Sequence, residues 1–535
     1  MLIKKKLITL LKISVFFLSL EIIAQDINTS PEAESSSNNA NEQLQDNITI
    51  IASEHNYNLD PHTSSYSSEA QILTGLYEGL FSYNPITLEP QFAIVSNYKI
   101  SRDKKRWTFT IRNDAKFSDG TPITAKNIKD SWLALLSEPN APYASLFYIV
   151  NGAKEFHSKT GSIENVGIKV IDDLNISLYL NAPAAHLPKL LCMNAFAVKN
   201  PNPFVSSGPF YIAEQNNEYL ILKKNEHYYD SVNTKLKQIT YIFSDDSEEN
   251  THAFNTGLAD WVSGPVDIKK LISKDSTHIS AEYATEYLFF KETPNSIWNN
   301  VDFRLALLEA IPWDKLRENT FVKATTLVYP LNGYPTVEGF SYTDKIEAKK
   351  MMDSARQKLN IAQDQIIPIT FAITDSEYMQ NKATLLKEAW QDLGVELSTI
   401  TVNTYEYLHK IQEINADLFS YTWIGDFADP LAFLELFRSN STLNVTNWKN
   451  SEFDKLLDEA ALYADENHSK ILAQAEQFLL NQGLIIPIQH PVSLNIIDLN
   501  TIGGWSVNSF DIHPLKYLFK KEQKINLPNV VLNYW

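Results

Sequence analysis

The sequence contains a single cysteine, Cys192, among its 535 residues. A single cysteine excludes an intramolecular disulfide and any paired CxxC motif. Cys192 lies in the apolar run Leu-Leu-Cys-Met-Asn, where a cysteine usually fills space in a core, so we predict no catalytic role for it. No cysteine lies near the end of the N-terminal apolar segment either, so no lipid attachment site is predicted there.

Positive charge and catalytic motifs are also scarce. The 46 Lys and Arg are outnumbered by 64 Asp and Glu, for a formal net charge of −18, which argues against a nucleic-acid partner. The sequence has no glycine-rich phosphate loop, no GxSxG elbow and no HExxH, and its 11 His form no pair four residues apart. The absence of motifs does not disprove catalysis, but it leaves an enzyme interpretation with no residues to name. We predict a protein that is not an enzyme and holds no metal or cofactor.

The first 24 residues have the composition of a secretory signal peptide. A basic segment, 1–6, precedes the largely apolar segment 7–20, and Ala24 offers a small residue for cleavage. The apolar segment is short for a membrane span, which needs about 20 residues. We expect cleavage near Ala24 and export to the periplasm, with an uncleaved anchor as the alternative. Residues 25–46 are polar and are expected to form a disordered leader.

Apolar side chains recur at two spacings along the rest of the chain. Alternation with a period of two predicts strands within 48–52, 106–112, 167–180, 218–224, 239–243, 368–373 and 396–402. Spacings of three to four residues predict helices within 69–80, 304–310, 346–359, 381–393, 451–463 and 469–480. This mixture predicts α/β lobes with partly parallel sheets, and the length exceeds what one small core holds.

The stretch Phe419-Ser-Tyr-Thr-Trp-Ile-Gly-Asp-Phe-Ala-Asp-Pro430 is the most informative in the chain. An aromatic, strand-like run ends at a glycine, and Asp426 follows directly. A lone acid beside a tryptophan at a bend is suited to hold a cation. Alternatively, Asp426 and Asp429 cap the helix expected over 431–437.

A series of short segments resembles a known family. In order they are Leu59-Asp-Pro-His62, Gly75-Leu-Tyr-Glu-Gly-Leu-Phe81, Trp107-Thr-Phe-Thr-Ile-Arg112, Ala115-Lys-Phe-Ser-Asp-Gly-Thr-Pro122, Ser207-Gly-Pro-Phe-Tyr211, Asn225-Glu-His-Tyr-Tyr229, Phe254-Asn-Thr-Gly257, Val301-Asp-Phe-Arg-Leu-Ala306, Leu393-Gly394, Trp423-Ile-Gly-Asp426, Phe453-Asp-Lys-Leu-Leu457 and Ile486-Pro487. The ordered set resembles the peptide-binding class, family 5, of the extracellular solute-binding proteins that serve ATP-binding cassette importers.

The resemblance implies a three-lobed, periplasmic-binding-protein-like α/β fold (type II, cluster C-like), with the ligand cleft between two lobes joined by a hinge. The implied division is lobe I at 46–78, 204–276 and 493–522, lobe II at 79–203, lobe III at 277–492, and a C-terminal tail at 523–535. The chain crossings near 264–280 and near Pro491 would carry the hinge.

The resemblance also implies how a ligand is held. In this family a peptide binds mainly through its backbone, like an added strand. The implied ligand-binding residues are Ser65, Ser67, Tyr143, Thr422, Trp423, Ile424 and Asp426, with Asp426 pairing with the ligand's α-ammonium. One departure concerns the ligand's carboxylate, since 416–421 carries no cation and His409 and Lys410 lie only upstream.

The implied function is a monomeric receptor that captures short peptides and delivers them to an inner-membrane ATP-binding cassette permease. Three alternatives stay open at this point. The same fold can carry a non-peptide cargo, such as a metal chelate, haem or an oligosaccharide. The chain can also be an exported hydrolase that uses a carboxylate pair, or a surface adhesin or signalling receptor without a permease.

Overall fold

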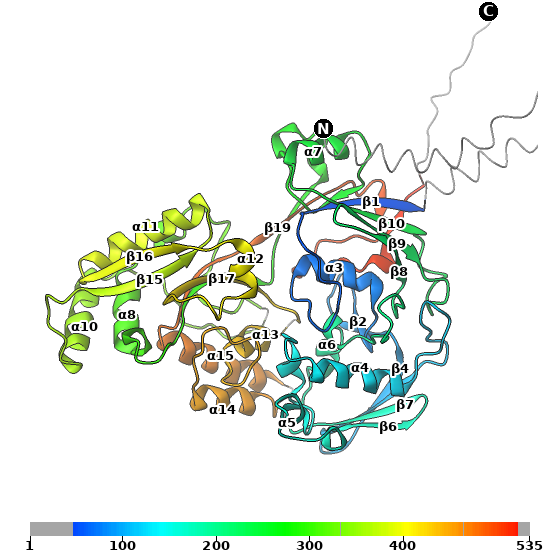
Figure 1. Cartoon of the computed structure of the whole chain (residues 1–535), viewed down its shortest axis with the longest axis horizontal. Coiled ribbons are helices and arrows are strands. Elements are labelled where there is room, and N and C mark those ends of the chain that lie inside the picture. The colour runs from blue at the N-terminus through cyan, green and yellow to red at the C-terminus, as the bar shows by residue number, and fades with distance from the viewer. Residues whose placement is uncertain (1–45, 332, 428, 464, 523–535) are drawn as a thin grey trace, which may run out of the picture.

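The computed structural model describes residues 46–522 except 332, 428 and 464, and leaves the side chains of 405, 408 and 409 undescribed. The expected signal peptide, nearly all of the leader and the expected tail therefore lie outside the described residues. Three larger β-sheets with their helices form three lobes (Figure 1). In the part of the chain that the structure describes, no helix is long and apolar enough to cross a membrane.

Lobe I is built on a mixed seven-stranded sheet with the order β12-β19-β11-β1-β10-β9-β8. Its strands are β1 (Asn47–Ala52), β8 (Phe210–Gln215), β9 (Tyr219–Lys224), β10 (Gln238–Phe243), β11 (Trp261–Val262), β12 (Thr277–Ala281) and β19 (Val492–Ile497). Helices α3 (Ser67–Leu76) and α7 (Ser247–Asn255) and the small ladder of β20 (Ile502–Gly503) and β21 (Phe519–Lys520) complete it.

The boundary of lobe I in the sheet topology differs from the one that the resemblance implied. Strand β12, which had been assigned to lobe III, pairs antiparallel with β19 over all five of its residues, from Thr277↔Ile496 to Ala281↔Val492. These backbone hydrogen bonds keep β12 in the first sheet. We therefore extend the second segment of lobe I to residue 281 and begin its third segment at residue 492.

Lobe II is an antiparallel sheet with the order β4-β5-β7-β6. It comprises β2 (Phe81–Tyr83), β3 (Pro90–Phe92), β4 (Val95–Ile100), β5 (Arg106–Ile111), β6 (Ile168–Asp172), β7 (Asn175–Tyr179), α4 (Ala125–Ser137), α5 (Ala153–His157) and α6 (Leu187–Leu190). The expected period of two is present in β5, where Trp107, Phe109 and Ile111 are buried and the residues between them are not. Thr124 caps α4 as a capping box with Asn127.

Lobe III is a mixed sheet with the order β14-β18-β13-β17-β15-β16. Its strands are β13 (Ala284–Phe290), β14 (Val322–Lys323), β15 (Ile367–Ile373), β16 (Val395–Thr401), β17 (Leu418–Ile424) and β18 (Ile485–His490). Its helices are α8 (Val301–Glu309), α9 (Trp313–Leu316), α10 (Lys345–Lys358), α11 (Glu377–Gln391), α12 (Thr404–His409), α13 (Leu431–Leu434), α14 (Ser451–Ala460) and α15 (Glu466–Asn481). Every residue of β13 is buried, as expected of a strand covered on both faces.

Two short crossings join lobe I to lobe III. Strand β12 continues into β13 through Glu282 and Tyr283, and β18 continues into β19 through Pro491. The N–H of Glu282 donates to the carbonyl of Pro491 at 2.9 Å, so the two crossings lie side by side. The expected crossing at Pro491 is present, whereas the other lies at 282–283 rather than within 264–280, because β12 still belongs to the first sheet.

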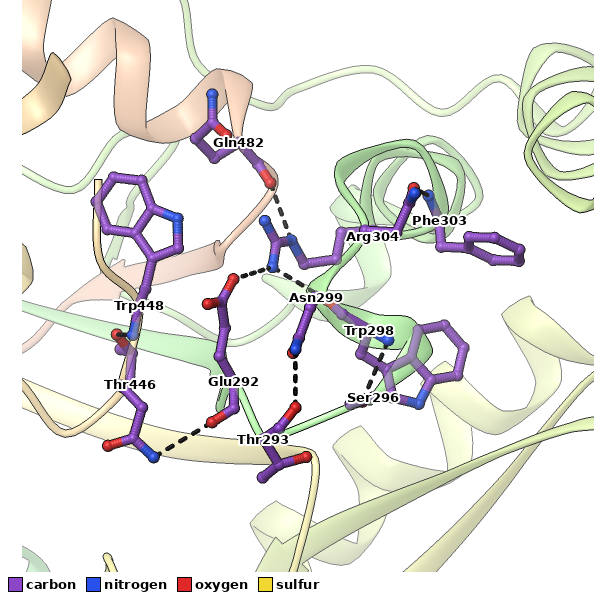
Figure 2. Close-up of polar contacts among 12 residues, drawn as sticks. Glu292, Thr293, Ser296, Trp298, Asn299, Phe303, Arg304, Thr446, Trp448 and Gln482 are labelled. Carbon is purple, nitrogen blue, oxygen red and sulfur yellow. Dashed lines mark hydrogen bonds and ion pairs between the residues drawn. The ribbon is translucent and has the colours of Figure 1, made fainter. Parts of the chain in front are cut away.

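The segment Val301-Asp-Phe-Arg-Leu-Ala306, one of the family motifs, has a structural role (Figure 2). The Arg304 side chain is almost completely buried and donates from Nη1 to Glu292 Oε1 (3.2 Å) and to the carbonyl of Trp298 (3.0 Å). Its Nε donates to the carbonyl of Gln482 at 3.0 Å. Because a buried guanidinium needs partners for its donors, this arginine fixes α8 against the end of α15.

Candidate functional site

A cavity of about 380 Å³ lies where the three lobes meet. This volume is at the small end of the range for small-ligand sites, roughly 300–1,000 Å³. All seven sequence-predicted site residues line it: Ser65 and Ser67 from lobe I, Tyr143 from lobe II, and Thr422, Trp423, Ile424 and Asp426 from lobe III. The fold therefore brings together residues that lie up to 361 positions apart in the sequence (from Ser65 to Asp426).

One edge of β17 is open toward the cavity. On its other edge β17 pairs with β13 over seven residues, from Leu418↔Phe290 to Ile424↔Ala284. On the open side it pairs with β15 only at Leu418↔Phe371. Strand β17 therefore has backbone hydrogen-bonding groups beyond Leu418 that β15 does not use.

The direction of these groups follows from the strand alternation. The backbone of Ser420 faces the Tyr407 side chain. The Ser420 N–H donates a hydrogen bond to the Tyr407 hydroxyl at 2.6 Å, and this hydroxyl donates to the Ser420 carbonyl at 2.9 Å. Gly425 lies five residues after Ser420, an odd number, so its backbone faces the opposite edge. Its N–H donates toward β13, to the carbonyl of Tyr283 at 2.7 Å. Since successive residues of a strand direct their backbone groups to opposite edges, those of Thr422 and Ile424 face the open edge.

The bend at Gly425 depends on close packing. A Cβ atom at this position would lie 2.4 Å from the ring of Tyr283, which no real side chain tolerates. Only glycine allows β17 to pass Tyr283 this closely and then turn. The next residue, Asp426, is thereby placed at the end of the open strand edge.

The Asp426 carboxylate is held in the cavity wall by lobe II. The Tyr143 hydroxyl donates to Asp426 Oδ1 at 3.2 Å, and the Tyr83 hydroxyl donates to the Asp426 carbonyl at 2.6 Å. Among the described residues no Lys, Arg or His forms an ion pair with Asp426. Burial raises the pKa of this carboxyl to about 7, although the Tyr143 hydrogen bond opposes the shift. An incoming cation would therefore meet a carboxyl that lacks a charged partner.

Asp429 has a different role from Asp426. Its Oδ1 accepts the Leu431 N–H at 3.0 Å at the start of α13, and lies 3.1 Å from His468 Nε2. The His468 hydrogen bond and charge outweigh burial and lower the Asp429 pKa. Asp429 thus bonds to the first residue of α13, although Pro430 occupies the N-cap position, whereas no described backbone N–H donates to the Asp426 carboxylate.

The lobe I wall is formed by the segment that leads into α3. Ser65 and Ser67 are exposed there and line the cavity. Behind them lies the buried Glu69, whose carboxylate accepts from Ser64 Oγ at 2.7 Å and from the Asn58 N–H at 2.7 Å. This carboxylate lies in the first turn of α3, where the helix dipole favours negative charge.

The aromatic part of the wall comes from β17. Trp423 is buried and its Nε1 donates to the carbonyl of Ala432 at 2.8 Å, which fixes the ring against α13. Tyr421 lies beside it, with the two rings 6.4 Å apart and close to parallel. Because residues two apart on a strand share a face, the two rings form one apolar surface.

Sequence reasoning missed several residues of the wall. Tyr83, Asn194, Thr374, Met379, Tyr407, Ser420 and Phe510 also line the cavity. Cys192, which we had interpreted as core filling, is buried but lies at the cavity wall as well. Such residues carry no sequence signal of their own, because only the closure of three lobes brings them to one surface.

Lobes II and III touch across the cleft beside Tyr143. The Thr442 hydroxyl donates to the Pro142 carbonyl at 2.5 Å, and the hydroxyls of Ser145 and Ser441 lie 3.2 Å apart. With the Tyr143–Asp426 hydrogen bond, these contacts close the cavity on the lobe II side. In the described part of the chain no group of three or more His, Cys, Asp or Glu is arranged to hold a metal ion.

Comparisons with known proteins agree with this architecture. A sequence profile of the bacterial extracellular solute-binding proteins, family 5 (middle region), matches residues 89–444. The chain is 26% identical over 479 residues to the oligopeptide-binding protein OppA of Bacillus subtilis (strain 168), which covers 84% of this chain and 88% of that protein. It is also 26% identical over 498 residues to the probable deoxycholate-binding periplasmic protein YgiS of Escherichia coli (strain K12), covering 87% and 90%.

A solved structure shows the same fold. The murein tripeptide binding protein MppA of Escherichia coli matches with a TM-score of 0.77 and 22% identity, over 89% of this chain and 99% of that chain. The predicted α/β, periplasmic-binding-protein-like fold class is thereby confirmed.

Proposed function

Because this chain belongs to family 5 of the bacterial extracellular solute-binding proteins, we propose that it is a receptor for short peptides. The observation that carries the proposal is the open edge of β17, which runs along the cavity and ends at Asp426. An extended peptide needs backbone partners along its length and a carboxylate for its ammonium. The open edge of β17 offers the backbone partners, and Asp426 offers the carboxylate just beyond the end of that edge.

In the proposed complex, the peptide backbone bonds to Thr422 and Ile424 on one side and to the Ser65–Ser67 segment on the other. Its α-ammonium pairs with Asp426, and Tyr143 orients that carboxylate from lobe II. Trp423 and Tyr421 provide an apolar surface for a side chain. Backbone contacts of this kind accept many sequences, because every peptide presents the same N–H and C=O groups.

The proposed cycle opens and closes the cleft at the paired crossings 282–283 and Pro491. Two short connections that share a hydrogen bond allow one lobe to rotate against another while both sheets stay intact. The proposed setting is the periplasm, reached after cleavage of residues 1–24, and the proposed partner is an inner-membrane ATP-binding cassette permease that receives the peptide from a monomer.

The alternatives fit the cavity less well. A deoxycholate-like cargo carries a carboxylate, which Asp426 would repel. A carboxylate-based hydrolase needs two acids at the reacting bond, whereas Asp426 is the only acid among the described lining residues. The test is mass spectrometry of ligands released from the purified, denatured protein, with calorimetric binding of the identified compounds. Recovery of bile acids, haem or sugars in place of peptides would refute the proposal.

Affinity is expected to depend on pH through Asp426. In the empty cavity its pKa is raised to about 7, and a bound ammonium lowers it by favouring the carboxylate. The empty protein therefore binds more protons than the complex, and affinity falls about tenfold for each pH unit below 7. Above about pH 8 affinity falls again, since the peptide's α-amine loses its proton near 7.7–8.0.

Calorimetric titrations from pH 5 to 9, in buffers with different ionisation enthalpies, measure both the affinity and the protons released. Asp426→Asn should flatten the acid limb and leave the alkaline limb in place. A wild-type affinity that stays constant from pH 8 to 5 would contradict the assigned role of Asp426.

A further inference from the structure

The cavity has an uneven distribution of charge. Of the 26 described residues that line it, Asp426 is the only one with a formal charge, and no described Lys, Arg, His or Glu is among them. The other polar groups are hydroxyls, one thiol, two thioethers, one amide, the Trp423 indole N–H and backbone groups. A ligand that fills the cavity therefore finds a charged partner for a cation, whereas these described side chains offer an anion only neutral hydrogen-bond donors.

The lobe I wall does not offer an anion site either. The start of α3, which also lines the cavity, already accommodates the buried Glu69 carboxylate. A second anion beside this helix end would be repelled by the first. Burial chiefly, and the charges of Asp426 and Glu69 to a smaller extent, raise the pKa of the Tyr143 hydroxyl.

The strand register shows which residues lie at the far end of the cavity from Asp426. Because β15 and β17 are parallel and Phe371 pairs with Leu418, Thr374 lies level with Tyr421. The last residue of β17, Ile424, is three residues further along the strand, roughly 10 Å away at about 3.3 Å per residue, and Asp426 follows after the bend at Gly425. Thr374, Met379 and Tyr407, all lining the cavity, are thus at the end that receives the remainder of a ligand bound at Asp426.

We propose that the cavity selects ligands with a free ammonium at one end and no carboxylate at the other end inside the cavity. The preferred class is therefore a short peptide with a neutral C-terminus, such as an amide, over the zwitterionic peptide of the same sequence. This inference rests on the proposed peptide-binding function and specifies its substrate class. The physical reason is that a carboxylate taken out of water without a cationic partner is strongly disfavoured.

The test uses one tripeptide sequence in four forms: free, C-amidated, N-acetylated, and both acetylated and amidated. Isothermal titration at pH 7.5 should show the amide binding roughly ten- to a hundredfold more tightly than the free peptide, and both acetylated forms binding weakly. The ratio of amide to free peptide should persist in 0.5 M NaCl, because buried charges are screened less than surface charges.

A free peptide that binds as tightly as its amide overturns the inference and leaves the peptide receptor intact. The inference also fails if the preference disappears in 0.5 M NaCl, because the preference then comes from the net charge of −18 and not from the cavity. If none of the four forms binds while released ligands prove to be of another kind, the proposed function itself fails.

A paired substitution tests the location of the selectivity. Thr374 is half-buried and lies at the end opposite Asp426, so Thr374→Lys supplies the missing cation there. We expect this variant to favour the free peptide over the amide, whereas Thr374→Met, of similar length but uncharged, keeps the wild-type preference. If the ratio of free-peptide affinity to amide affinity is the same in the two variants, the ligand's C-terminal end does not lie at Thr374.

Discussion

Replacement of Asp426 by Asn is expected to weaken binding of free-amino peptides by roughly 30-fold to a few thousand-fold, or about 2–5 kcal/mol. Asn keeps the shape of the side chain and can still accept a hydrogen bond from Tyr143, which lies 3.2 Å away. It lacks the negative charge, so the ligand's ammonium would be buried without a charged partner. Isothermal titration of wild type and variant with the same peptide measures the loss.

Two controls separate charge recognition from damage to the fold. N-acetylated peptides should bind the wild type weakly, and Asp426→Asn should narrow the difference between free and acetylated forms. Asp429→Asn is the matched variant, because Asp429 is buried nearby but bonds to Leu431 and His468. It should lower the melting temperature without changing the preference for a free amine. Unaltered affinity in Asp426→Asn would show that Asp426 does not receive the ligand's amino end.

A disulfide between lobes II and III is expected to trap the cleft in its closed form. The hydroxyls of Ser145 and Ser441 lie 3.2 Å apart, so cysteines at these positions need only a small shift to form a bond of about 2.0 Å. In oxidised Ser145→Cys/Ser441→Cys, ligand release should slow by roughly a hundredfold if the remaining route is a local unfolding that costs about 3 kcal/mol more. Stopped-flow release of a fluorescent peptide measures this rate.

Reduction of the disulfide should restore the wild-type rate, and each single variant should behave like the wild type. Disulfide exchange between Cys192 and the two introduced cysteines should be slow. Burial raises the pKa of the Cys192 thiol and so suppresses the reactive thiolate. Rapid release from the fully oxidised double variant would show that ligand exchange does not require lobes II and III to separate.

Local structure was largely predictable from the sequence. The apolar periods place β5, β15, β16, α10 and α15 within a few residues of where they are observed, because each period is set by the geometry of a single element. The Trp-Ile-Gly-Asp motif alone left two roles open for Asp426, a cation site or a helix cap. The resemblance of the whole ordered set of segments favoured the first, and Asp426 lines the cavity.

The assembly of these elements was not predictable in the same way. Strand β12 was assigned to the wrong lobe because its partner, β19, is more than 200 residues away and only the pairing decides the sheet. Asp426 and Asp429 look alike in the sequence, and yet one faces the cavity and the other bonds to His468, which comes from a distant helix.

The sequence by itself therefore determined the family, many of the strands and helices, and an acid, Asp426, that lines the cavity. The tertiary structure alone decided that Tyr83, Thr374 and Phe510 line the same cavity and that the described lining holds a carboxylate but no cation. The physical reason is that a binding cavity is defined by contacts between lobes. Such contacts depend on how the lobes pack and on strand pairing over long distances in the chain, which no local pattern of residues encodes.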